Sequence, residues 1–341
     1  MESACSDCYI IGRNKYGLSM AKMLEAGGYT MLGFIDDYCT EVSFGSWPVV
    51  SSGAIGGKYA IFNCVVEGRT IDTQGFILTL SPQSIFDYFA LQACFPQYLP
   101  EIDFLEDTES IEHDWNNYIE VYNRLEDARS KIEYERVLNF RYNRDIRFLK
   151  DFSMRLAEQY FEPFLALPNE PVFIDGGGFD GSTTLGFVGR HPAFRKVHYF
   201  EPNPAFFNLS KKNLESTRDI CWHNEGLWDS KCCLSFNPEL NSASKLDILG
   251  SIEVPVTTID LSVSGQVDFI KLDIEGAELE ALKGAEGVIR SQKPVMAVCI
   301  YHRQRHFYEI PLFLMSQHQD YKVFIRHYTQ GVFETVMYFT R

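Results

Sequence analysis

After Leu165 the chain alternates short apolar runs with stretches of helical spacing, and this alternation limits the fold more than any other feature. Such a pattern predicts parallel strands that are joined by crossover helices. The last two apolar runs are separated only by a short turn around residues 329–332, so the sheet should end in an antiparallel hairpin. We therefore expect an α/β domain over residues 166–341, with a seven-stranded sheet that ends in this hairpin.

A second, smaller α/β pattern begins the chain. Apolar runs at 8–12 and 30–37 flank an amphipathic stretch, which predicts a strand, a helix and a second strand. Further apolar runs, including Ala60–Val66 and Gly75–Leu80, are interpreted as added strands of a small parallel sheet. We expect a Rossmann-like domain over residues 1–105 and, because glycine disappears and charge rises, a helical connector over residues 106–165.

Charge and cysteine content limit the partners and the compartment. A formal net charge of −15 disfavours nucleic acid and anionic membrane surfaces as main partners. An odd number of cysteines, nine, with several inside apolar runs, suits a reducing cytoplasm. No apolar run is long enough for a membrane span, and no signal segment is evident. The single Cys5-x-x-Cys8 pair lacks further ligands in sequence, so no metal site is predicted.

The strongest local motif is the glycine-rich turn that follows the strand at residues 172–176. A buried strand, a tight turn and a helix start, with Ser182 or Thr183 as the expected cap, form a ligand cradle. The turn also satisfies G-x-G-x-x-G, so by itself it fits a dinucleotide as well as S-adenosylmethionine. Its candidate cofactor-binding residues are Asp175, Gly176, Gly177, Gly178 and Gly181.

Polar residues also end the next two strands. Glu201 follows the glycine turn by about twenty residues, where a carboxylate can accept both ribose hydroxyls of a nucleoside. It could instead simply end the strand before two prolines. Asn224, Glu225 and Trp228 end the third strand, where an adenine would lie, although a structural role explains them equally well.

The fourth strand of this domain carries charged residues inside an apolar run. Lys271 lies within the strand, and Asp273 and Glu275 follow at its carboxyl end, where open α/β sheets bind ligands. Burying such groups without a role would be costly. A helix cap would explain Glu275, but it would explain Asp273 and Lys271 less well.

Together these motifs resemble the FkbM methyltransferase family over roughly residues 165–341. The family has an Asp-x-Gly turn, a Phe-Glu-Pro-Asn strand end and a Lys-x-Asp-x-Glu-Gly-x-Glu junction. They match here Asp175 with Gly177, residues 200–203 and residues 271–278. The IYHR segment at 300–303 resembles the family's fifth strand end. Arg305 and His306 stand where the family has an acidic residue, a departure that bears on the acceptor side.

This resemblance implies a class I methyltransferase fold, S-adenosylmethionine as cofactor and methylation of an oxygen atom on a saccharide or another small molecule. Because the sulfonium methyl is already activated, the protein must mainly align the acceptor and take up its proton. Asp273, Glu275 and His302 are the catalytic candidates, and Asp273 is also expected to contact the cofactor. The paired acids could hold Mg²⁺, but the ligand set in sequence is incomplete.

The N-terminal segment resembles the small nucleotide-sugar-binding domain that precedes some sugar acyltransferases. Gly12 and Gly17 flank its first turn, and Asp36 and Asp37 end its second strand. These four residues are the candidates for a nucleotide or nucleotide-sugar site. The alternative is a purely structural domain or a dimerising domain; a dimerising domain would make the protein a homo-oligomer.

Two other functions remain open from sequence. The chain could be an NAD-dependent nucleotide-sugar oxidoreductase or epimerase that uses either glycine turn, although no Tyr-x-x-x-Lys pair supports it. It could also be a non-catalytic nucleotide-binding scaffold. Four acids at strand ends (Asp175, Glu201, Asp273 and Glu275) favour an active enzyme.

Overall fold

A computed structural model describes residues 6–106, 108–236 and 252–341. Within these ranges the chain forms two compact units, each built from separate stretches of sequence. The division into three consecutive parts (1–105, 106–165 and 166–341) stays a prediction. The first unit comprises the described residues up to Thr108, Glu135–Leu156 and Tyr328–Phe333; the second comprises Glu109–Tyr134, Ala157–His327 and Glu334–Arg341.

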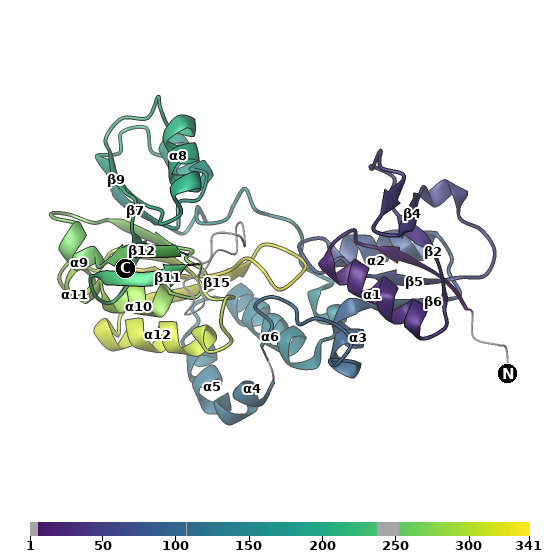
Figure 1. The fold of residues 1–341 in the computed structure, drawn as a ribbon. Coiled ribbons are helices and arrows are strands. Elements are labelled where there is room, and N and C mark those ends of the chain that lie inside the picture. The colour runs from purple at the N-terminus through teal and green to yellow at the C-terminus, as the bar shows by residue number, and fades with distance from the viewer. Residues whose placement is uncertain (1–5, 107, 237–251) are drawn as a thin grey trace. The chain divides into compact units, whose positions relative to one another are not determined.

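The first unit contains a six-stranded sheet of order β3-β4-β2-β1-β5-β6 (Figure 1). All neighbouring strands are parallel except β3 and β4, which confirms the Rossmann-like prediction. The strands are β1 (Asp7–Ile11), β2 (Thr30–Ile35), β3 (Ser43–Phe44), β4 (Trp47–Val50), β5 (Ala60–Asn63) and β6 (Ser84–Asp87). The helical elements that begin and end in this unit are α1 (Lys15–Ala26), η1 (Ser52–Ala54), α2 (Thr70–Thr79), α3 (Tyr88–Cys94) and η2 (Ile146–Leu149).

One predicted strand of this unit is wrong. Gly75–Leu80 lies almost entirely in helix α2 rather than in the sheet. The reason is topological, since β5 and β6 pair in parallel and a parallel connection needs a crossover segment. Ile77 supplies the buried contact of the helix, whereas Leu78 is exposed.

The second unit contains a seven-stranded sheet of order β15-β16-β14-β13-β7-β8-β9. The five neighbouring strands β9, β8, β7, β13 and β14 pair in parallel. Strand β16 runs antiparallel to both β14 and β15, which confirms the expected terminal hairpin. The loop of this hairpin, residues 328–334, is longer than the four-residue turn that the sequence suggested. The strands are β7 (Val172–Gly176), β8 (Lys196–Phe200), β9 (Ile220–His223), β13 (Phe269–Leu272), β14 (Val295–Cys299), β15 (Lys322–His327) and β16 (Thr335–Thr340).

A small three-stranded sheet that the sequence did not predict also belongs to this unit. It consists of β10 (Gly226–Leu227), β12 (Ile252–Thr257) and β11 (Cys232–Phe236), in that order. The backbone of Trp228 extends it, because the Trp228 amide donates to the Thr257 carbonyl at 2.8 Å. The chain after β9, the third strand of the large sheet, therefore enters a separate sheet.

Helices supply the crossovers of the second unit. The structure bears out the helical character of residues 106–165 in α4 (Glu109–His113), α5 (Trp115–Arg124) and α6 (Ala128–Asn143), the last of which continues into the first unit. Helix α12 lies beside α10, α11 and α5 (Figure 1). No helix among the described residues is long and apolar enough to cross a membrane. The remaining helices are α7 (Ser182–Arg190), α8 (Pro204–Asn213), α9 (Ile259–Ser262), α10 (Glu278–Lys283), α11 (Glu286–Gln292) and α12 (His306–Gln317).

Two details of these helices differ from expectation. The stretch from Ala277 to Arg290 forms two helices, because the Asp260 carboxylate accepts from the Gly287 and Val288 amides at 2.7 and 2.9 Å and caps the second one. Neither Ser182 nor Thr183 caps α7. Gly181 holds the cap position in the left-handed region, at φ +88°, where glycine carries no steric penalty.

Close packing of the glycine turn gives a stability prediction. A Cβ atom on Gly178 would lie 2.1 Å from the Tyr199 ring, which is fully buried and donates its hydroxyl to the Phe179 carbonyl. We expect Gly178→Ala to lower the free energy of unfolding by about 1–3 kcal/mol, because the ring must move. Gly189→Ala in helix α7 is the matched control, since nothing lies within 4 Å of its added Cβ. Denaturant unfolding of both variants tests this; equal stabilities would contradict the packing argument.

Candidate active site

Two turns of the second unit meet at one edge of the large sheet. The glycine turn after β7 contacts the junction that follows β13, where the Asp273 amide donates to the Gly176 carbonyl at 3.1 Å. Gly177 has φ +75°, and an added Cβ would lie 1.8 Å from the Asp273 carbonyl oxygen. Only glycine fits this position, so the two motifs found in the sequence form one site.

Lys271 connects these two turns. Its Nζ lies 3.2 Å from Asp175 Oδ1 and donates to the carbonyls of Gly176 and Gly177 at 3.1 and 2.7 Å. Both charged side chains are buried. Burial lowers the pKa of Lys271, but the carboxylates of Asp175 and Asp273 outweigh it and the pKa is raised. Asp175 thus neutralises a buried cation, and its other oxygen accepts from the Thr184 hydroxyl at 2.7 Å.

Glu201 lies at the carboxyl end of β8, as expected, and is buried. Its Oε2 accepts from the Phe179 amide at 2.9 Å, and its Oε1 accepts from the Asn203 amide at 2.8 Å. Each oxygen therefore keeps acceptor capacity for one further donor. Burial raises the pKa of Glu201 to about 7, against the lowering effect of these two amides.

Of the three residues predicted to contact adenine, Asn224 and Glu225 follow β9, and Trp228 follows β10 of the small sheet. Asn224 lies beside Glu201, since its Nδ2 donates to the Glu201 carbonyl at 2.8 Å. Glu225 is the next residue, at the start of the small sheet. Trp228 lies beyond β10, where its carbonyl approaches Gly284 closely enough to exclude a side chain there. The cofactor roles of all three stay predictions.

The catalytic candidates Asp273, Glu275 and His302 are brought together. His302 is buried at the end of β14, with its Nε2 3.5 Å from Asp273 Oδ1 and 3.4 Å from Glu275 Oε2. Its Nδ1 lies 2.9 Å from Glu278 Oε1. An imidazole held on one nitrogen by a buried carboxylate presents the other nitrogen in a fixed orientation.

Glu278, the last acid of the sequence motif, contacts both His302 and His306. Its Oε2 lies 3.2 Å from His306 Nδ1, and its Oε1 accepts from the Ile274 and Gly276 amides at 2.9 and 3.3 Å. Burial alone would raise the pKa of Glu278, but His302 and His306 hold it well below its usual range. Glu278 is thus an ionised anchor for the turn and for both histidines.

The neighbouring acids behave differently. Burial raises the pKa of Glu275 to about 8, despite the opposing effect of His302. Burial lowers the pKa of His302, yet Glu278 and Glu275 outweigh it and raise the value to about 9. Environments that separate the pKa values of adjacent groups in this way are typical of acid–base sites. The site can therefore hold and exchange protons near neutral pH.

Sequence reasoning missed three side chains of this cluster. The hydroxyls of Tyr160 and Tyr301 donate to Asp273 at 2.8 and 3.4 Å. Glu334, in the loop before β16, shares a hydrogen bond with Gln159, and burial raises its pKa to about 7. The only signal for them was a tyrosine beside His302; the other two come from segments distant in sequence.

The cluster also has the composition of a cation site. Asp273, Glu275 and His302 each offer a ligand atom, and these atoms lie within 4.8 Å of one another. Carboxylate and imidazole ligands suit a divalent ion. The sequence-based expectation that no metal is bound stays a prediction.

At the candidate N-terminal nucleotide site, both aspartates interact with other residues of the chain. Asp36 Oδ2 pairs with Arg13 Nε at 2.7 Å, and Asp37 accepts from the amide and hydroxyl of Ser52 at 2.7 and 2.6 Å. Gly12 and Gly17 form the turn after β1, where a Cβ on Gly17 would lie 2.1 Å from the Gly12 carbonyl oxygen. Nucleotide binding at these four residues stays a prediction.

The buried anchor gives a second stability prediction. Glu278→Gln removes the buried counter-charge of His302, so it should cost about 3–5 kcal/mol of unfolding free energy at pH 6. At pH 6 the lowered pKa of Glu278 and the raised pKa of His302 both contribute fully to the free energy of unfolding. The contribution of His302 is lost as the pH rises through about 9. Glu280→Gln, which removes only a surface pair with Lys283, should cost no more than about 1 kcal/mol. Equal losses would show that the anchor is unimportant.

Comparison with known proteins gives the domain family and the fold of this chain. Residues 175–329 match the Methyltransferase FkbM domain. The crystal structure of a methyltransferase FkbM from Methylobacillus flagellatus KT is 21% identical, covers 98% of this chain and 90% of its own, and has a TM-score of 0.77, so the fold is shared.

Two other solved structures cover only about half of this chain. An rRNA methylase from Streptococcus thermophilus is 13% identical, covers 51% of this chain and 89% of its own, and has a TM-score of 0.35. Aeropyrum pernix fibrillarin is 14% identical, covers 54% of this chain and 74% of its own, and has a TM-score of 0.36. No curated protein matches. Residues 175–329 are therefore identified as a Methyltransferase FkbM domain, whose cofactor is S-adenosylmethionine.

Proposed function

We propose that this protein transfers a methyl group from S-adenosylmethionine to a hydroxyl oxygen of a sugar, a glycan or a related small metabolite. The observation that carries the proposal is the buried His302 imidazole, which faces Asp273 and Glu275 while Glu278 holds its other nitrogen. An oxygen acceptor must lose a proton during methyl transfer, and this cluster can take it up.

The residues at the sheet edge fit the cofactor. Glu201 retains one acceptor site on each carboxylate oxygen, which suits the two ribose hydroxyls of the nucleoside. The three consecutive glycines 176–178 leave the backbone of the turn open to a ligand, and Asn224 and Glu225 follow the next strand end, toward the expected adenine position. When bound, the cofactor supplies an activated methyl group on a sulfonium centre.

The chain's own residues would then align the acceptor and accept its proton. Asp273 is held by the hydroxyls of Tyr160 and Tyr301, so its orientation is fixed before an acceptor arrives. The raised pKa values of Glu275 and His302 mean that this pair carries protons at neutral pH. Loss of one of these protons creates the base, so alkaline conditions up to about pH 9 favour turnover.

The acceptor class rests on chemistry rather than on a bound molecule. A cluster of carboxylates, tyrosines and a histidine is rich in hydrogen-bonding groups, as a polyhydroxylated acceptor requires. The formal net charge of −15 disfavours a polyanionic acceptor such as nucleic acid. The nucleotide-sugar resemblance of the first unit points in the same direction, toward saccharide substrates.

Cofactor binding gives a test with a defined pH dependence. If ionised Glu201 accepts the ribose hydroxyls, a pKa of about 7 means that S-adenosylhomocysteine should bind about 10-fold more tightly at pH 8 than at pH 6. Glu201→Gln should weaken binding at pH 8 by roughly 10-fold or more and remove the pH dependence.

Calorimetric titration of the folded proteins measures both effects. Glu215→Gln, an exposed change that also removes one negative charge, should leave the affinity unaltered. Thermal unfolding of each variant separates loss of the contact from loss of structure. Binding of NAD without binding of S-adenosylhomocysteine would refute the proposed function and favour an oxidoreductase.

A further inference from the structure

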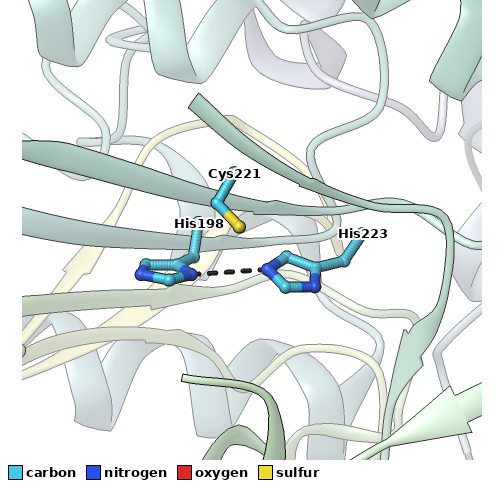
Figure 2. Close-up of side chains that lie close together, drawn as sticks. All are labelled: His198, Cys221 and His223. Carbon is cyan, nitrogen blue, oxygen red and sulfur yellow. Dashed lines mark hydrogen bonds between the residues drawn. The ribbon is translucent and has the colours of Figure 1, made fainter. Parts of the chain in front are cut away.

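A cluster of potential metal ligands lies on strands β8 and β9, outside the groups used above. His198 and Cys221 are directly paired across the two parallel strands. His223 follows Cys221 by two residues, and alternate residues of a strand project from the same face. Figure 2 shows the Cys221 sulfur directed toward the space between the two imidazole rings. The strand register therefore brings the three side chains together.

The spacing of the ligand atoms matches a transition-metal site. His198 Nδ1 lies 3.3 Å from His223 Nε2, and one ligand atom from each of the three residues lies within 4.8 Å of the others. Two nitrogens bound tetrahedrally to zinc at about 2.0–2.1 Å are separated by about 3.3–3.4 Å. A small closure of the sulfur position would complete three corners of a tetrahedron.

The two imidazoles are held in place before any ion binds. The ring of His223 stacks on the Phe200 ring, with centroids 4.1 Å apart and an interplanar angle of 6°. His198 is 5% exposed. Burial lowers the pKa of His198 to about 4 and also lowers that of His223, so both rings are neutral at neutral pH, as ligation requires.

Ordinary core packing does not account for this grouping. Tyr199 and Trp222, the intervening residues of the two strands, pack against each other, and Trp222 also packs against Phe207 of α8. The apolar contact between the strands and this helix is thus made by the alternate residues. The polar trio projects from the other face, where Cys221 and His223 are only partly buried and solvent can reach them.

We propose that His198 Nδ1, His223 Nε2 and Cys221 Sγ bind a borderline-soft divalent transition metal ion, with Zn²⁺ as the expected occupant. Two imidazoles and one thiolate are ligands that zinc prefers, and a fourth position remains for water or another donor. Binding converts the Cys221 thiol to a thiolate and releases its proton to solvent. The ion would fasten edge strand β9 to β8, the strand that ends at Glu201.

Cobalt substitution in the full chain tests this site. The protein is first stripped with a chelator, verified metal-free by elemental analysis and then titrated with Co²⁺. A thiolate ligand gives a sulfur-to-cobalt charge-transfer band. The carboxylates of Asp273 and Glu275 and the imidazole of His302 contain no sulfur and cannot produce this band. We expect a band that saturates at one equivalent and that is lost in Cys221→Ser and in His223→Gln.

Two cysteine controls make the assignment specific. Cys299→Ser removes the thiol of another potential ligand group, with Asp273 and Glu334, and Cys232→Ser removes an exposed thiol; both should retain the band. Circular dichroism verifies the fold of each variant, and the partly exposed His223→Gln provides a test if Cys221→Ser unfolds. Absence of a charge-transfer band, or its survival in folded Cys221→Ser or His223→Gln, would overturn the proposal.

Discussion

The buried ion pair between Lys271 and Asp175 is the interaction on which the second unit depends. It joins the central strands β7 and β13 where both give way to turns, and the Lys271 ammonium also holds two carbonyls of the glycine turn. The ring of Tyr160 lies 5.4 Å from the same ammonium. Removal of either charge would leave the other buried without its opposite charge, a change that costs about 3–5 kcal/mol in proteins.

The acids around this pair can be close together because basic side chains lie among them. Asp175 faces Lys271, while Glu278 faces His302 and His306. Asp273 and Glu275 both face His302 Nε2, and burial raises the pKa of Glu275. Glu278, with its lowered pKa, therefore anchors His302 beside Glu275, and the pKa values of His302 and Glu275 are both raised.

Much of this arrangement could be predicted from the sequence, because it depends on local patterns at strand ends. Charged or glycine residues next to an apolar run mark three of its parts in the sequence: the glycine turn, Glu201 and the Lys271–Glu278 junction. In the structure Asp273, Glu275 and His302 lie close together, and their catalytic roles stay predictions. What local pattern could not supply was long-range contact: Tyr160 and Glu334 enter from distant segments, and Gly75–Leu80 became a crossover helix because the parallel sheet demanded one.

The most direct test of the central claim is to locate the transferred methyl group. The protein would be incubated with S-adenosylmethionine carrying an isotope-labelled methyl group and with a panel of saccharides and nucleotide sugars, and products would be identified by mass spectrometry and NMR. The account predicts a labelled methyl ether on a hydroxyl oxygen, formed by the wild type and lost in folded His302→Asn. Label on nitrogen or carbon, or equal turnover by His302→Asn, would contradict it.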